Sequence, residues 1–238
     1  DFIKSKLFCP YLGTLLFFEA TPGYGRRLLN ISFLFCIYKH LKVLNLEGIN
    51  LRLKELPAEV ESLLCLRYLA LRAMFMEFIP PSIAKLSHLE TFSLNSFEAV
   101  SLPDSIWNMK KLRHVHVRPG VVIPLSSDDS GVENLSNLET LSALFLYLDE
   151  EGENLLRRIP NVRRLKIFDL ALNALNRACR NMSQLECLES LTLGSFNFSG
   201  SREHVELSFP MNLKKLCLSF LGLPCRKMSL IEQLPNLE

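Results

Sequence analysis

The chain has 238 residues, of which 48% are apolar and 22% are charged, and its formal net charge is +2. Such a composition is that of a globular protein, and so small a net charge gives no overall reason to expect nucleic acid or an anionic membrane as the partner. No apolar run reaches the roughly 18 residues that span a bilayer. The seven cysteines are odd in number and none lies in a Cys-x-x-Cys pair, which favours reduced thiols in a cytosolic protein over a disulfide framework or a zinc site.

The first predicted element is a strand within residues 7–18, LFCPYLGTLLFF. Lys4 and Lys6 precede this apolar run and give it a superficial likeness to a secretory signal peptide. The chain begins with Asp rather than Met, however. Pro10 lies inside the run, and no small-x-small cleavage site follows. We therefore expect a strand of one more repeat here.

From residue 41 onward the pattern LxxLxL recurs at near-equal intervals. The first apolar residues of the units are Leu41, Leu66, Leu89, Leu112, Leu138, Val162, Leu188, Leu213 and Leu237, with Leu12 marking an earlier unit. From Leu41 the spacings are 25, 23, 23, 26, 24, 26, 25 and 24 residues. A period of about 20–29 residues is the signature of leucine-rich repeats. We predict a single domain over residues 1–238, with about nine to ten irregular repeats and truncation at both ends.

Each unit combines two apolar periodicities. The second and third apolar residues of LxxLxL are two apart, so on a strand they point to one face. Before the strand, residues such as Ile106, Met109 and Leu112 recur every three, as on one side of a helical or 3₁₀ turn. Stacked units bury these edges together. We therefore predict an α/β fold, a curved, right-handed leucine-rich repeat solenoid with a parallel β-sheet on its concave side and short helices, 3₁₀ turns and loops on its convex side.

Prolines and one aromatic residue refine this prediction. Pro57, Pro80 and Pro103 follow Leu or Ile where the chain turns from the strand side to the helical side, since proline fixes φ and needs no hydrogen-bond donor. Trp107 is expected to cover the convex side, and Phe92 is expected in the core. The polar segments 126–131 and 198–204 are expected to be inserted loops.

The repeats depart from the common pattern at the ninth position. Asn or Cys usually stands there and satisfies backbone groups. Here the position holds Ile49, Met74, Phe97, Gly120, Leu146, Leu170, Phe196 and Leu221. We therefore expect no asparagine ladder and repeats held mainly by packing.

Several stretches resemble a known family. LPAEVESLLCLRYLAL, IPPSIAKLSHLETFSL and LPDSIWNMKKLRHVHV resemble the leucine-rich repeat region of plant intracellular NLR immune receptors. HLKVLNLEGINL resembles the repeat with which such regions open. SGVENLSNLETLSAL followed by LLRRIPNVRRLKI resembles the coiled-coil NB-LRR subclass that includes late-blight-type disease resistance proteins.

This resemblance implies a cytoplasmic protein-recognition role in plant defence and the hypersensitive response. In such receptors the repeats help to sense a pathogen effector or a guarded host protein. They also restrain a nucleotide-binding module that exchanges ADP for ATP. The chain has no GxxxxGK[ST] loop, so we expect no nucleotide or other cofactor in this segment. No Ser/His/Asp or Cys/His set converges in the predicted register, so we expect no enzymatic activity.

The register also identifies a candidate partner-binding face. The third, fifth and seventh positions of the units point outward, and they are mostly small and polar. The exceptions are two groups with basic residues, one at 114, 116 and 118 and the other at 164, 166 and 168. They are expected roughly 10 Å apart, with Thr140 and Ser142 between them. The residues expected to bind a partner are Tyr68, Arg72, His114, His116, Arg118, Arg164, Lys166 and Phe168. The face is either merely solvated or a contact for an acidic surface. Leu144 is predicted to point outward at a seventh position.

Other functions have weaker support in the sequence. His114 and His116 lack further ligands in register, so we expect no metal site. The basic run 157–164 lacks interleaved aromatic residues, so we expect no nucleic-acid partner. Asn30, Asn134, Asn181 and Asn197 begin glycosylation sequons, which leaves an extracellular repeat receptor or inhibitor as an alternative. An intracellular repeat scaffold and the substrate-recognition solenoid of a ubiquitin ligase are further alternatives.

Overall fold

The computed structural model describes residues 11–18, 31–123, 134–146, 151–169, 182–195, 208–221 and 228–238. Its elements are β1 (Thr14–Leu16), α1 (Ile31–Ile37), β2 (Val43–Asn50), η1 (Ala58–Ser62), β3 (Tyr68–Arg72), η2 (Pro81–Lys85), β4 (Thr91–Asn95), β5 (Val100–Ser101), η3 (Asp104–Asn108), β6 (His114–Arg118), β7 (Val121–Val122), β8 (Thr140–Leu146), α2 (Glu151–Arg158), β9 (Arg164–Asp169), η4 (Met182–Gln184), β10 (Ser190–Ser195), β11 (Lys215–Ser219) and α4 (Ser229–Glu232).

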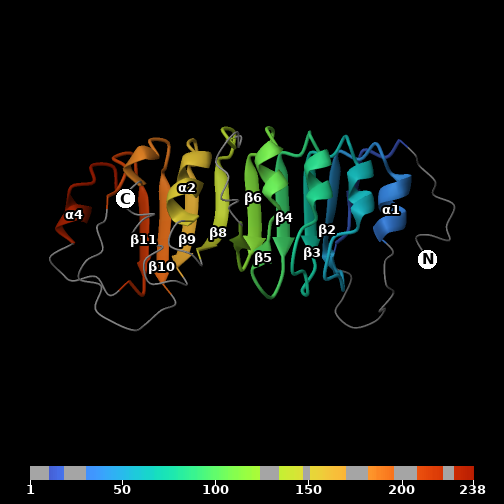
Figure 1. Cartoon of the computed structure of the whole chain (residues 1–238), viewed down its shortest axis with the longest axis horizontal. Helices are drawn as coiled ribbons and strands as arrows, with labels where there is room; N and C mark the ends of the chain where they lie inside the picture. The colour runs from blue at the N-terminus through green and yellow to red at the C-terminus, as the bar shows by residue number, and fades with distance from the viewer. Residues whose placement is uncertain are drawn as a thin grey trace.

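The strands form one parallel sheet in the order β1-β2-β3-β4-β6-β8-β9-β10-β11. Figure 1 shows them side by side along the long axis of the molecule, from the blue N-terminal end to the red C-terminal end. The nine strands of this order begin at the third position of the predicted units. Their first residues are paired in register: Thr14, Val43, Tyr68, Thr91, His114, Thr140, Arg164, Ser190 and Lys215. The strand predicted around Leu12 is thereby confirmed as β1.

The apolar residues of the strands alternate between the core and the groove side as predicted. In β4, Phe92 and Leu94 are each 1% exposed, whereas Thr91 and Ser93, which alternate with them, are half-buried. The spacing of three places Ile106, Met109 and Leu112 in the same core. On the other side of that core, α1, η1, η2 and η3 contact one another in series. This is the leucine-rich repeat solenoid that the period predicts.

The proline corners lie where they were predicted. Pro57, Pro80 and Pro103 each directly precede a 3₁₀ helix, with φ of −57°, −70° and −75°. The corners are joined by parallel bridges that pair Phe78 with Glu55 and with Ser101. A ring with a fixed φ and no N–H fits this position because the amide there has no ladder partner to lose.

Trp107 lies in η3 and is only 2% exposed. The guanidinium carbon of Arg158, from α2, lies 5.1 Å from the centre of its ring. Arg158 is buried as well. The convex side therefore holds a buried cation–π contact that joins residues on either side of 124–133 in the sequence.

The prediction for Leu144 is wrong. Leu144 is buried and pairs with Ile167, and it is Phe145 that lies opposite Phe168. The register shifts between Leu141 and Leu144, so that one strand has an extra residue, a β-bulge. An extra residue moves every following side chain to the other face, which carries Leu144 into the core.

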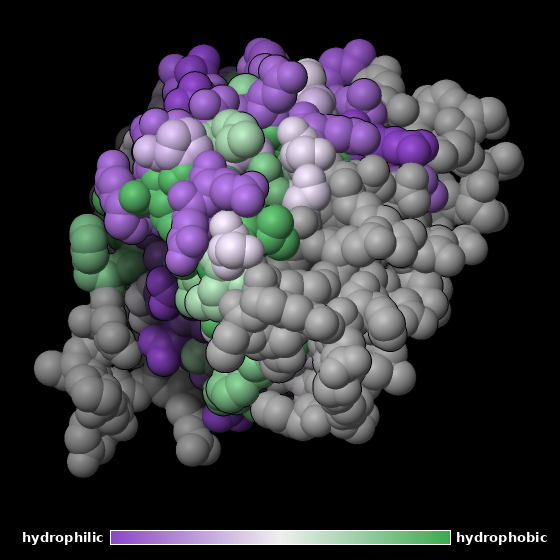
Figure 2. All heavy atoms as spheres, turned by 90° about the vertical axis from the view of Figure 1, so that its left-hand side faces the viewer, coloured by the Kyte–Doolittle hydropathy of each residue, from purple (hydrophilic) through white to green (hydrophobic). Residues whose placement is uncertain are grey.

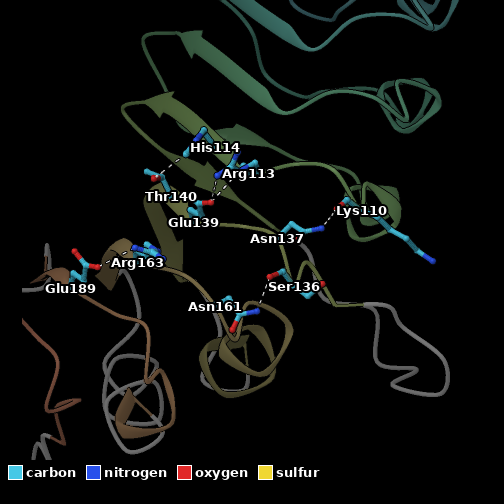
Figure 3. Close-up of polar contacts among 10 residues, drawn as sticks. All are labelled: Lys110, Arg113, His114, Ser136, Asn137, Glu139, Thr140, Asn161, Arg163 and Glu189. Carbon is cyan, nitrogen blue, oxygen red and sulfur yellow. Dashed lines mark hydrogen bonds and ion pairs between the residues drawn. The ribbon is translucent and has the colours of Figure 1, made fainter.

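The repeats have no asparagine at the ninth position, but packing is not their only link, because asparagines bond between repeats at another position. Asparagines directly before the first apolar residue of a unit donate side-chain N–H groups to backbone carbonyls of the preceding repeat. The bonds are Asn137 to Lys110 (2.6 Å), Asn161 to Ser136 (2.8 Å), Asn212 to Glu186 (2.8 Å) and Asn236 to Met211 (3.0 Å). Figure 3 shows the first two. The ninth position has no asparagine, but the second half of the chain has polar inter-repeat contacts at another position.

The predicted loops 126–131 and 198–204 lie outside the described residues, and so do Asn30, Asn181 and Asn197 of the glycosylation sequons. Among the residues that the structure describes, no helix is long and apolar enough to cross a membrane. Figure 2 shows the end of the solenoid that carries β11 and α4, where hydrophobic residues gather in the middle and hydrophilic ones lie outside them. The core-facing Leu216 and Leu218 of β11 are accordingly only half-buried.

Candidate functional site

A groove of about 780 Å³ runs across the outward face of the sheet. Its lining comes from every strand of the main order between β2 and β10. The polar residues that line it are Glu47, Tyr68, Arg72, Thr91, Ser93, Asn95, His116, Arg118, Thr140, Ser142, Arg164, Lys166 and Ser190. A hollow over a curved parallel sheet is the surface on which solenoids bind other proteins.

Six of the eight predicted site residues line this groove: Tyr68, Arg72, His116, Arg118, Arg164 and Lys166. His114 does not line it. Its Nδ1 lies 3.3 Å from Thr140 Oγ1, and its ring stacks on that of His116 with centroids 6.0 Å apart. The two imidazoles therefore support each other on β6.

Phe168 also lies outside the groove lining. Its ring stacks on Phe145, the residue that the bulge brings into this row, with centroids 5.7 Å apart. On the other side, a Cβ added to Gly194 would lie 2.5 Å from the Phe168 ring. Gly194 thus leaves the room that the ring occupies, and Phe168 is held by packing at the end of β9.

The sequence of this chain matches the family described as "Leucine-rich repeat region" over residues 29–238, which include the whole groove. The chain belongs to this leucine-rich repeat family. Late blight resistance protein homolog R1B-8 of Solanum demissum is 32% identical over 222 residues, which cover 88% of the chain and 16% of the relative. Homolog R1B-16 of the same species is 36% identical over 170 residues, 66% of the chain and 12% of the relative.

These relatives confirm the resemblance to late-blight-type resistance proteins, and the region spans only a small part of their length. Among solved structures, a leucine-rich repeat protein of Leptospira interrogans covers 87% of this chain and 68% of its own, with 16% identity and a TM-score of 0.42.

Two columns of cations on the strand side of the leucine-rich repeat region differ in their partners. At the second position of the units, charges alternate in sign along the edge of the sheet: Arg67, Glu90, Arg113, Glu139, Arg163, Glu189 and Lys214. Arg67 pairs with Glu90 at 3.6 Å, Arg163 with Glu189 at 3.3 Å and Lys214 with Glu189 at 3.4 Å. Arg113 pairs with Glu139, and Figure 3 shows this pair beside Arg163 and Glu189.

The closest of these pairs shifts the pKa values of both its members. The hydrogen bond between Arg113 and Glu139 raises the pKa of the Arg113 guanidinium and lowers the pKa of the Glu139 carboxyl below its ordinary value. Reasoning from the sequence missed this column. From the Leu66 unit to the Leu213 unit, the residue after the first apolar residue alternates between Arg or Lys and Glu, and that alternation was the available signal.

The second column of cations lies in the groove. Arg118, Arg164 and Lys166 have no ion pair with any residue that the structure describes. The one carboxylate of the groove lining is Glu47, which accepts a hydrogen bond from Ser93 Oγ at 2.9 Å on the β2 side. The β6 to β9 part of the groove is therefore basic.

Titratable groups respond to this arrangement. The pKa of His116 is lowered, first by burial and then by the charges of His114, Arg164 and Arg118. Arg164 belongs to β9 and His116 to β6, so this charge reaches His116 from the other side of β8. At the acidic end, the pKa of Tyr68 is raised by burial and by the nearby Glu47.

The described residues hold no group of three or more His, Cys, Asp or Glu side chains placed to bind a metal ion. The groove offers charged and imidazole N–H donors rather than an activated nucleophile.

Proposed function

We propose that this leucine-rich repeat region is the protein-recognition module of a cytoplasmic plant disease-resistance receptor. Its groove binds an acidic surface of a partner, and the region has no enzymatic activity of its own. The partner is a pathogen effector, a guarded host protein, or the nucleotide-binding module of the same receptor. The names of the relatives support the role in defence.

One observation carries the assignment of the surface. The chain pairs cations in the second-position column and leaves Arg118, Arg164 and Lys166 in the groove without a carboxylate among the described residues. Like charges that remain unpaired beside each other repel, and a negatively charged partner removes this repulsion. Complementary charge also speeds encounter and excludes wrong partners.

The adjacent residues Arg163 and Arg164 provide a matched test. Both are exposed arginines, but Arg163 pairs with Glu189 and Arg164 lines the groove. The full-length protein that contains this region would be expressed in plant leaf cells with Arg164→Glu and Lys166→Glu together. If the groove restrains the nucleotide-binding module, we expect the double variant to cause cell death without a pathogen. If the groove binds an effector or a guarded host protein, we expect no cell death even when the pathogen is present.

The control is Arg163→Gln, which removes a cation of the edge and should leave cell death as in the wild type. Protein levels would be compared by immunoblot. Wild-type behaviour of the double variant at equal protein level would leave the groove as a solvated face without a role in recognition.

A further inference from the structure

The centre of the groove, between β6 and β9, supplies almost only positively charged donors. The two small residues of β8 that lie there have hydroxyl groups, but these are engaged. Ser142 Oγ accepts from the Val117 amide at 2.7 Å and donates to the Val117 carbonyl at 3.0 Å. Thr140 Oγ1 is 3.3 Å from His114 Nδ1. A ligand here meets cationic N–H donors on both sides and needs acceptor oxygens to match them.

Positive charge is concentrated at this place. Arg118 comes from β6, and Arg164 and Lys166 come from β9, with β8 between the two strands. Neighbouring strands are about 4.8 Å apart, so the two sides are separated by roughly the width of one small anionic group with its hydrogen bonds. On β4, the residue opposite His116 is Ser93, which adds no charge.

We propose that the space over Thr140 and Ser142 binds the phosphoryl group of a phosphorylated side chain, carried on an extended segment of a partner protein. This inference rests on the proposed function and names the chemistry of its partner. A phosphoryl group brings a charge of about −2 and three acceptor oxygens. Two arginine forks and a lysine match it, whereas a single carboxylate neutralises only one cation.

The shape of the groove favours a peptide over a small metabolite. A small-molecule site usually encloses most of its ligand, but this groove lies along an open sheet face and takes residues from strands β2 to β10. An extended segment can cross it and place one modified side chain at the cationic centre.

The probe is a set of three short synthetic peptides that differ only at a central serine, glutamate or phosphoserine. Binding to the 238-residue chain is measured by calorimetry. We expect the phosphoserine peptide to bind about tenfold more tightly than the glutamate peptide, and the serine peptide to bind least. Arg164→Gln and Lys166→Gln should each weaken the phosphoserine peptide about tenfold, and Arg163→Gln should not change its affinity.

A second readout reports the place of binding. A dianion near His116 favours the protonated imidazole, so the phosphoserine peptide should raise the pKa of His116 from its lowered value. The charged and titratable groups that act on this ring are His114, Arg118 and Arg164, and the ring resonances in NMR separate His116 from His114 once each is assigned by substitution.

Three results would overturn the inference. Equal affinity for the glutamate and phosphoserine peptides would show that the site does not select a phosphoryl group. The proposed recognition of an acidic surface would still hold. If inorganic phosphate bound as tightly as the phosphoserine peptide, the peptide segment would contribute nothing to recognition, and the proposed ligand would be wrong. A phosphoserine peptide that does not bind at millimolar concentration, or that binds Arg164→Gln and wild type alike, would remove the site itself.

Discussion

The hydroxyl of Ser142 takes the place of a strand partner for Val117, because it accepts from the Val117 amide and donates to the Val117 carbonyl. The backbone pairing between β6 and β8 covers only His114 with Thr140 and Val115 with Leu141. One side chain thus closes the gap that the bulge opens in the sheet.

Ser142→Ala should therefore lower the stability of the chain more than the loss of one hydroxyl group from the surface usually does. Removing the hydroxyl leaves both polar groups of Val117 without this partner, and we expect a loss of about 1–3 kcal/mol in the free energy of unfolding. Urea denaturation would measure it. Ser190→Ala, at a groove position of β10, is the control, and an equal effect of both variants would contradict the role of Ser142.

Phe92, inside β4, and Phe97, two residues after its end, test the orientation of this strand. Phe92 is 1% exposed and Phe97 is 66% exposed. Phe92→Ala should lower the free energy of unfolding by about 3–5 kcal/mol, since it removes a ring from the continuous core. Phe97→Ala removes an exposed ring that packs edge-to-face on Phe75 at 5.9 Å, and should cost at most about 1.5 kcal/mol. Similar thermal midpoints for the two variants would show that the register of β4 is wrong.

Asn137 tests the polar contacts between repeats. Asn137→Ala removes the bond to the Lys110 carbonyl, and because the site is exposed we expect a loss of about 0.5–1.5 kcal/mol. Asn108→Ala, an exposed asparagine in η3, serves as the comparison in the same denaturation experiment. If Asn108→Ala destabilised the chain as much, the inter-repeat bond would not be the cause.

His116 predicts a specific dependence of stability on pH. Its pKa in the folded chain is below the ordinary 6.5, so the folded state binds fewer protons than the unfolded state in this range. Its contribution is complete above about pH 6.5 and is lost as the pH falls through the folded-state pKa. His116→Gln should remove this part of the decline.

The measurement compares urea midpoints at about pH 7.5 and about pH 5 for wild type and variant. Thr91→Ser, a groove position without a titratable group, is the control and should keep the wild-type decline. A decline that is the same in His116→Gln would assign the pH dependence to other groups.

Most of the fold followed from the sequence because the repeat period and the spacing of apolar residues act in every unit at once. Phe92 and the proline corners were predicted for this reason. The bulge was not, because Leu144 and Phe145 are both apolar, and a period of two cannot decide which of them turns inward. That choice depends on how Ser142 bonds to a neighbouring strand.

The candidate site was predicted only as a row of outward residues. The sequence placed Arg163 and Arg164 side by side, but which of them meets a carboxylate depends on where the strand begins. Arg163 precedes β9 and reaches Glu189 along the edge, while Arg164 is the first residue of the strand. The asparagine contacts were not predicted, because asparagine bonds in such repeats are expected at the ninth position. Asn137, Asn161 and Asn212 instead stand directly before the first apolar residue of a unit.

The alternating charges along the edge of the sheet also limit how this molecule can change its length. From Arg67 to Lys214 each cation is followed, one repeat later, by a glutamate, and each glutamate by a cation. Deleting or duplicating one repeat inside this span would place two cations or two glutamates beside each other. Deleting or duplicating two would keep the alternation. A change of length that keeps the alternation from Arg67 to Lys214 therefore adds or removes repeats in pairs, roughly fifty residues at a time.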